Sequence, residues 1–209
     1  MTEDNCVAGE IPPEFRPPEW LTETTPKRAP YFPQMGDQLM YFMQGHMLYV
    51  EAVMNRKLYT VDRRSLPWMK NTKFREVEHV KIIGMKYEIK PPRLCCLKLG
   101  IMDPGNEKLS METFTIKYHD IPDVLDFLVL KQTYDVAMTR RWQKGDRFRC
   151  IIDDAWWIGT VECEEPHLAE FPDSLFMCYK VLWDNGEKER LSPWDMEVID
   201  DSSMLFIYF

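Results

Sequence analysis

The sequence lacks the features that mark several large classes of protein. No apolar run approaches the ~20 residues that a transmembrane helix needs, and the first residues carry acids instead of the basic stretch of a secretory signal peptide. We therefore expect a soluble, intracellular chain. With 209 residues, 45% of them hydrophobic and 13% aromatic, the chain is long and apolar enough to bury a core, which excludes an intrinsically disordered protein.

Metal-binding and catalytic motifs are also missing. The six cysteines include no CxxC pair and the four histidines are scattered, so we expect reduced thiols and neither a structural metal nor a cofactor. GxSxG, P-loop, GxGxxG and HExxH motifs are absent. Asp153 and Asp154 are adjacent in a predicted strand and point to opposite faces, which favours a polar turn at the rim over a shared site. Nothing in the spacing favours a thiol–imidazole pair of Cys95 or Cys96 with His119. We expect a protein that is not an enzyme.

What the sequence does contain is a pattern of short strands between Gly145 and Asp200. After a Gly-Asp turn, apolar residues alternate with arginines, which is typical of a half-buried strand. Gly159 permits a sharp bend or a close backbone approach in the next strand. Together these features predict a small antiparallel barrel. In the first expected strand, Phe148, Cys150 and Ile152 face one way. The further strands are expected over 156–163, 176–183, 187–191 and 196–199.

The same alternation predicts where two tryptophans point. Trp157 lies on the inward face at the start of one strand and Trp183 on the inward face at the end of another, so both rings reach one mouth of the barrel. Aromatic faces beside a carboxylate attract a methylated ammonium group. Taken singly, each tryptophan is better explained as a core residue; the pair at one rim favours a cage. The candidate cage residues are Trp157 and Trp183 as walls, Trp156 or Tyr179 as a further wall, and Asp184 and Asn185 as the polar edge.

Negative charge is concentrated in this barrel. Residues 145–200 hold five Lys or Arg against fourteen Asp or Glu, a balance of −9, whereas the whole chain carries −8. A negative surface repels phosphate backbones and attracts basic peptides. Direct nucleic-acid binding is therefore not expected, although charge on one face also serves solubility.

A weaker copy of the barrel opening occurs near the start of the chain. Gly36-Asp37 precedes apolar residues at alternate positions, with the spacing seen after Gly145-Asp146. We therefore expect two packed units and a mainly β fold with one or two helices. A short helix is expected over 47–54, with His46 in the turn before it. Candidates for a second aromatic pocket are Tyr41, Phe42 and Tyr49, with an ordinary core as the alternative.

The remaining segments complete the expected organisation. Strands are expected over 80–88, 94–102 and 111–118, and a helix over 124–138, which is apolar on most sides, with Asp120 as its N-cap. Seven of the fifteen prolines fall within residues 1–33. The expected parts are a proline-rich linker or arm (1–33), a first unit with an insertion (34–120), a connecting buried helix (121–143), the second barrel (144–200) and an atypical apolar tail (201–209).

Several segments resemble a known family. The chain is similar, over roughly residues 12–200, to the segment between the WD repeats and bromodomains of the bromodomain-and-WD-repeat family. This resemblance implies a cryptic Tudor domain, a small barrel of the Royal superfamily, which is associated with methylated lysine 4 of histone H3. The segments that carry it include WLTETTPKRAPYFPQMGDQ, YFMQGHMLYVEAV, LCCLKLG, KYHDIPDVLDFLVL, GDRFRCIIDDAWWIGT and LSPWDMEVI.

The resemblance and the residues together favour a nuclear chromatin reader that binds a methylated H3 tail. Where some Tudor barrels have an aromatic residue at the end of the first strand, this chain has Ile152, so a shallow pocket, or one completed by the first unit, is an alternative to a four-sided cage. A second alternative is a structural spacer that docks against the adjacent bromodomain of a longer chain without binding methyl-lysine. A third is recognition of methyl-arginine or single-stranded RNA, against which the negative charge argues.

Overall fold

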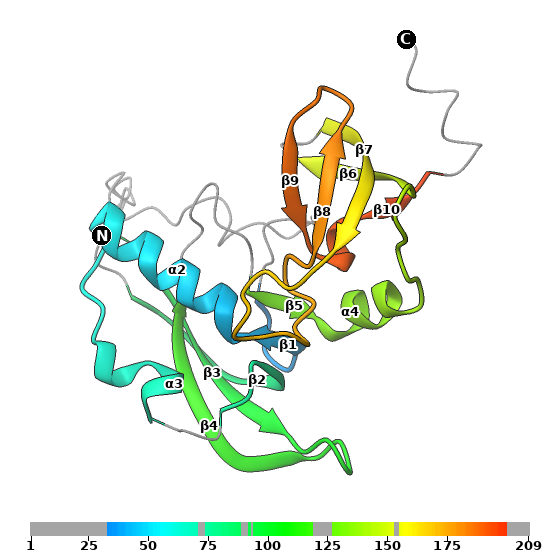
Figure 1. The fold of residues 1–209 in the computed structure, drawn as a ribbon. Helices are drawn as coiled ribbons and strands as arrows, with labels where there is room; N and C mark the ends of the chain where they lie inside the picture. Colours follow the sequence, from blue (N-terminus) through cyan, green and yellow to red (C-terminus); the bar gives the residue numbers. More distant parts are fainter. Residues whose placement is uncertain are drawn as a thin grey trace, which may run out of the picture.

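The computed structural model describes residues 33–70, 74–88, 92, 94–118, 127–152 and 155–199. The fold is mainly β and contains two antiparallel five-stranded sheets, arranged as two packed, small, barrel-like units (Figure 1). This confirms the expected fold class. Within these ranges no helix is long and apolar enough to cross a membrane. The proline-rich arm up to residue 32, His119, the expected N-cap Asp120, the Asp153-Asp154 turn and the apolar tail lie outside the described residues.

The first unit contains a sheet with the strand order β4-β3-β2-β1-β5. The expected strand over 94–102 is confirmed as β3, and the strands on either side of it extend a few residues beyond the expected ranges. The elements are β1 (Gln38–Phe42), α2 (Met43–Arg56), the 3-10 helix η2 (Arg63–Ser65), α3 (Pro67–Lys70), β2 (Val77–Glu88), β3 (Leu94–Met102), β4 (Leu109–Tyr118) and β5 (Leu128–Leu130).

The second unit contains a sheet with the strand order β10-β6-β7-β8-β9. Its expected strands are confirmed, except that the third begins at Tyr179 and not at Phe176, and the last is only two residues long. The elements are α4 (Lys131–Met138), which precedes the sheet, then β6 (Arg147–Ile152), β7 (Ala155–Glu164), β8 (Tyr179–Trp183), β9 (Lys188–Leu191), the 3-10 helix η3 (Pro193–Asp195) and β10 (Glu197–Val198).

Both units begin with a Gly-Asp turn of the same backbone geometry. Gly36 and Gly145 have φ angles of 92° and 91°, a region that glycine adopts without the penalty of a Cβ. Each glycine amide donates to a carbonyl of the neighbouring strand, at 3.0 and 2.8 Å. Asp37 and Asp146, which follow the glycines, each accept from the amide three residues earlier, at 3.0 Å in both cases. The repeat seen in the sequence is therefore confirmed as repeated backbone geometry.

The helix after β1 is longer than expected. Gly45 and His46, which were expected before the helix, lie inside α2 and are buried, so the expectation of a turn residue at His46 is wrong. A Cβ on Gly45 would lie 2.8 Å from atoms of Phe127 and Phe176. Tertiary packing against these rings therefore overrides the low helix propensity of glycine.

The helix expected over 124–138 is confirmed over Lys131–Met138, but its expected extent through 128–130 and its expected burial are wrong. Leu128–Leu130 forms β5, an edge strand that pairs with β1, and the helix α4 covers only Lys131–Met138 and has no buried residue. A short apolar run does not by itself distinguish a buried strand from a buried helix. Leu128 and Val129 are apolar because the strand covers the core.

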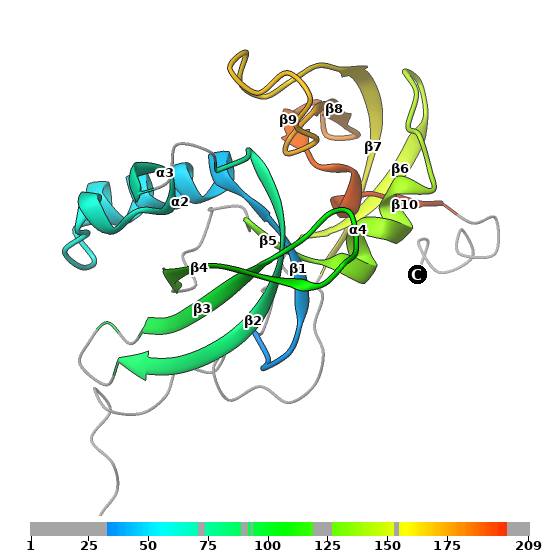
Figure 2. The same ribbon diagram turned by 90° about the horizontal axis from the view of Figure 1, so that it is seen from below.

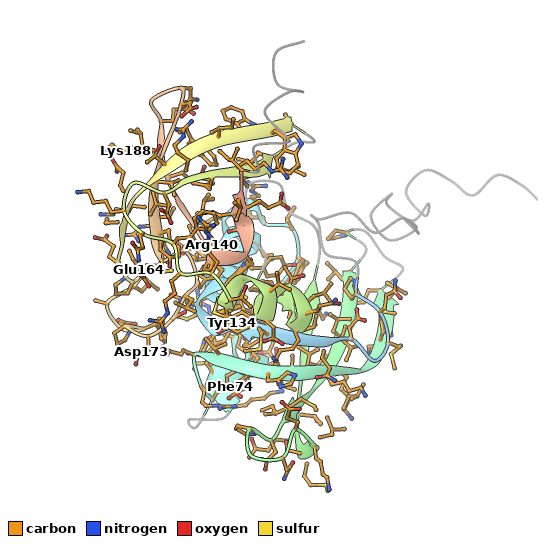
Figure 3. All side chains as sticks on the ribbon, turned by 90° about the vertical axis from the view of Figure 1, so that its right-hand side faces the viewer. Phe74, Tyr134, Arg140, Glu164, Asp173 and Lys188 are labelled. Atoms are coloured by element: carbon orange, nitrogen blue, oxygen red, sulfur yellow. The ribbon has the colours of Figure 1, made fainter. Side chains whose placement is uncertain are left out.

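A cluster of aromatic residues joins the two units. Phe42 at the end of β1 lies 4.7 Å from Trp194 of η3 and 5.9 Å from Phe176, measured between ring centroids. Tyr134 of α4 contacts both Phe42 and Trp194, and Figure 3 labels it between the two sheets. Figure 2 shows α4 beside β10 and close to β1. The helix α4 therefore helps to connect the two units through the side that carries Tyr134.

Gly159 sets the packing inside the second sheet. It lies opposite Trp183 in the register of β7 and β8, and a Cβ there would fall 2.8 Å from the ring of Phe148 and 3.0 Å from the carbonyl oxygen of Leu182. The close backbone approach expected at this glycine is confirmed. The absence of a side chain lets the Phe148 ring lie across the strand and contact Trp183, at 5.3 Å between centroids.

Replacement of Gly159 by alanine is expected to lower the free energy of unfolding by about 1–3 kcal/mol, because the methyl group would overpack the interior. Urea denaturation measures this change. Gly84→Ala is the matched control, since Gly84 is also a strand glycine but has only the side chain of Lys98 nearby. Equal stability of Gly159→Ala and the wild type would contradict this account of the packing.

Candidate functional site: the tryptophan rim of the second sheet

Trp157 and Trp183 meet at one end of the second sheet, as the sequence predicted. Their ring centroids are 6.1 Å apart and their planes make an angle of 67°, an edge-to-face arrangement favoured between aromatic rings. The two side chains differ in exposure: Trp157 is 37% exposed and Trp183 is 3% exposed. Trp157 therefore offers a ring surface to a ligand, and Trp183 supports it from inside.

Glu189, which the sequence reasoning missed, places a carboxylate against Trp183. The indole Nε1–H of Trp183 donates to Glu189 Oε2 at 2.9 Å. Glu189 lies two positions before the buried Leu191 on β9, so it projects from the inner face of the sheet. Alternation along the expected strand 187–191 was the signal that could have identified it.

Asp184 and Asn185, the expected polar edge, are engaged elsewhere. The Arg147 guanidinium donates to both carboxylate oxygens of Asp184, at 2.5 and 2.7 Å, and this interaction lowers the pKa of the Asp184 carboxyl. Asn185 stabilises its own turn, because its amide nitrogen donates to Glu187 Oε2 and its amide oxygen accepts from the Glu187 backbone. Neither side chain contacts the tryptophan pair through a hydrogen bond in the described part of the chain.

Among the described residues, Glu189 has no cationic partner. All five basic residues of 145–200 form salt bridges, and among the described residues none of those bridges is to Glu189. The pairs are Arg147–Asp184, Arg149–Glu197, Lys180–Glu165, Lys188–Glu162 and Arg190–Glu165. The rim thus combines a partly exposed indole with a carboxylate whose charge no side chain of this unit neutralises.

Trp156 and Tyr179 are not brought to the same rim. Trp156 is 47% exposed and lies on the opposite face of β7, where the guanidinium of Arg149 stacks 4.2 Å above its ring. Tyr179 is buried at the other end of β8, four residues before Trp183 or about 13 Å along a strand. Burial raises the pKa of Tyr179 to about 12. Neither ring can form a wall beside Trp157 in this arrangement.

The candidate second pocket is occupied by core side chains. Tyr41 and Phe42 are fully buried and Tyr49 is 2% exposed. The Tyr41 hydroxyl is 2.8 Å from His46 Nδ1, and the His46 ring stacks on Phe127 at 4.5 Å. Burial lowers the pKa of His46 to about 3, so the imidazole is neutral at physiological pH. Tyr41, Phe42 and Tyr49 therefore form part of an ordinary core, which was the alternative to a second pocket.

An acidic cleft of about 410 Å³ lies at the far end of β7 from the tryptophans. Glu164 and Asp173 line it and lie on the same side of the molecule in Figure 3, and Glu165 is paired with Lys180 and Arg190. Within the described ranges no group of three or more His, Cys, Asp or Glu residues could hold a metal ion. The tryptophan rim is therefore the better candidate for ligand binding.

The fold and the rim define a protein of two packed, small β units that presents an aromatic–carboxylate surface. The model of the BRWD/PHIP ancillary domain-like domain matches residues 29–204, and the chain belongs to this family. Its resemblance to bromodomain-and-WD-repeat proteins is thereby confirmed.

Two relatives illustrate the range of similarity. A bromodomain and WD repeat-containing protein of Dictyostelium discoideum is 25% identical over 242 residues, covering 88% of this chain and 11% of the relative. Auxin response factor 2B of Solanum lycopersicum is 27% identical over 112 residues, covering 48% of this chain and 14% of the relative. The chain thus spans about a tenth of the length of the first relative.

The two rim tryptophans are expected to differ in their contribution to stability. Trp183→Ala should lower the free energy of unfolding by about 3–5 kcal/mol, because it opens a cavity in the core. Trp157→Ala should cost about 1 kcal/mol, since much of that ring already faces solvent. Urea denaturation of both variants checks the difference, and equal losses would show that Trp157 is as much a core residue as Trp183.

Proposed function

We propose that this chain is a non-catalytic chromatin reader that binds a methylated lysine of the histone H3 tail. The methylammonium group lies against the exposed surface of Trp157, beside the edge of Trp183. The observation that carries the proposal is the tryptophan pair, in which the partly exposed ring of Trp157 packs edge-to-face against the buried Trp183. Lysine 4 is the target that the family resemblance implies.

The physical chemistry of the rim suits a weakly hydrated cation. An aromatic face attracts a cation by about 0.5–2 kcal/mol, more when the site is desolvated, and the carboxylate adds Coulomb attraction. The −9 balance of residues 145–200 favours the approach of a basic peptide. A site with one exposed indole is a partial cage, so binding to a single peptide is expected in the micromolar range.

The proposal places the chain in the nucleus, next to a bromodomain when it is part of a longer protein. The rim lies at the end of β7 and β8 away from the first unit (Figure 1). A histone tail can therefore reach it without displacing the aromatic cluster between the units.

Trp157→Ala is expected to weaken binding of a methylated lysine 4 peptide by about two- to thirtyfold, since it removes a cation–π contact of about 0.5–2 kcal/mol. The measurement is calorimetric titration with H3 tail peptides that are unmodified or mono-, di- or trimethylated at lysine 4. The wild type should bind the methylated peptides more tightly than the unmodified one.

Trp156→Ala is the matched control, because it removes a ring of the same type and similar exposure from the other face of the same strand. It should leave methyl-dependent binding unchanged. Loss of binding in Trp156→Ala with retention in Trp157→Ala would move the site to the outer face and contradict the proposal. Absence of methyl-dependent binding in the wild type would reject the reader function.

A further inference from the structure

The first unit carries a group of exposed cations between α2 and β2. Residues 56–75 hold seven Lys or Arg against one Asp, a balance of +6, whereas residues 145–200 have a balance of −9. Arg75 is paired with Glu78. Four other cations of this segment are exposed, and none of them forms a salt bridge with another described residue. The members of this cationic patch are Lys57, Arg63, Arg64 and Lys70.

Apolar residues of the same segment anchor it to the core and leave the cations outside. Leu58, Leu66 and Trp68 pack against the buried cluster of the first unit. The Trp68 ring meets the buried His46 ring edge to face, at 5.1 Å between centroids. The backbone of the segment is therefore held against the unit, and the long charged side chains between these anchors face solvent.

The turn that carries the two arginines is held by local hydrogen bonds. The Asp62 carboxylate accepts from the backbone amide of Arg64 at 3.0 Å, and among the described residues it forms no salt bridge with a guanidinium group. The Arg63 guanidinium lies 3.6 Å from Sδ of Met54, in the last turn of α2. This contact brings the arginine turn next to Lys57, which follows the last residue of that helix.

We propose that the cationic patch binds the phosphate backbone of double-stranded DNA, without regard to base sequence. Lysine and arginine side chains that neutralise phosphates release condensed counterions, and this release is the main source of sequence-independent binding to DNA. The choice of DNA as the polyanion rests on the proposed function, because a chain that binds a histone tail is held beside the DNA that the histone octamer wraps.

The composition of the patch favours a phosphate backbone over a protein partner or a single strand. The centre of a protein–protein interface is depleted in charged residues and enriched in aromatic ones, and single strands stack their bases on aromatic rings. Among the described residues of 56–75, Met69 is the one large apolar side chain that is exposed, and no aromatic ring is. The patch therefore offers charge and little else.

The patch is remote from the acidic second unit. The end of α2 and the helix α3 lie at the side of the first unit that faces away from the second sheet (Figure 1, Figure 2). At physiological ionic strength, interactions between exposed charges are largely screened beyond about 8 Å. The expectation against nucleic-acid binding came from the charge of residues 145–200 and therefore concerns the second unit, where a basic peptide is favoured.

The test is a fluorescence-anisotropy titration of a short labelled DNA duplex with the whole chain at several salt concentrations. Four phosphate contacts predict that log K falls with the logarithm of the salt concentration with a slope of about −3 to −4. The variant Arg63→Ala/Arg64→Ala should bind about 10- to 60-fold more weakly at about 0.1 M salt, with a slope smaller in magnitude by about 2. Arg63→Lys/Arg64→Lys should retain most of the affinity, because lysine also binds phosphate as a point charge.

Lys108→Ala/Lys144→Ala is the matched control. It removes the same charge from two exposed lysines outside the patch, one between β3 and β4 and one before β6. Its affinity for the duplex should change little. Thermal unfolding close to that of the wild type is expected for all three variants, since exposed side chains contribute little to stability.

Several results would overturn the inference. They are no binding of the duplex by the wild type, an unchanged affinity and slope in Arg63→Ala/Arg64→Ala, and an equal loss of affinity in the lysine control. Binding of a polyglutamate peptide as tightly as the duplex would also overturn it, because the patch would then be a surface for acidic proteins.

Titration of the same proteins with the methylated H3 peptide separates this inference from the proposed function. Arg63→Ala/Arg64→Ala should bind the peptide as the wild type does, because the patch and the tryptophan rim lie on different units. Methyl-dependent binding by a chain that does not bind DNA would overturn the inference alone. DNA binding through the patch without methyl-dependent peptide binding would reject the reader function alone.

Discussion

The hydrogen bond of the Trp183 indole is the interaction on which the rim depends. A buried indole N–H needs an acceptor, since leaving it unpaired in a core costs about 1–3 kcal/mol. The Trp183 ring is seated inside the second sheet because Gly159 leaves room for Phe148 beside it. Its N–H then points to Glu189. Core packing therefore fixes the position of a carboxylate at the surface.

The repeated architecture explains why this rim is accessible. Each unit opens on the same Gly-Asp corner, and the units pack through Phe42, Phe176 and Trp194. Phe176 lies just before β8 and Trp194 just after β9, so the junction lies at the base of this hairpin. Trp183 and the turn that follows it lie at the opposite end (Figure 1). The junction holds the second unit in place and leaves its tryptophan rim uncovered by the first unit.

Much of the fold could be predicted from the sequence because period-two alternation and turn residues act locally. The strand over 94–102, the Gly-Asp repeat and the inward direction of Trp157 and Trp183 all follow from such patterns. The helix expected over 124–138 was wrong over 128–130 because pairing of Leu128–Leu130 with β1 is a tertiary interaction. Apolar character alone does not reveal it.

The composition of the site was harder to predict for a related reason. Asp184 follows Trp183 directly, which suggested it as the acidic partner, but the side chain pairs with Arg147 across the sheet. Glu189 is six residues from Trp183 and reaches it only because the hairpin folds back. The partner of each acidic side chain depends on which residues the folded strands bring next to it. The spacing of residues along the sequence does not determine these neighbours. The pairing of Trp156 with Arg149 on the outer face is a second example.

The most direct test of the account is a ¹H–¹⁵N NMR titration that follows the indole N–H resonances during addition of an H3 peptide dimethylated at lysine 4. The account predicts that the resonances of Trp157 and Trp183 move together and saturate with the binding isotherm, because Trp157 contacts the ligand and Trp183 packs edge-to-face against Trp157. The resonances of Trp68, in the first unit, and Trp194, at the junction, should stay in place. Shifts confined to Trp68 or Trp194 would contradict the account and place the ligand elsewhere.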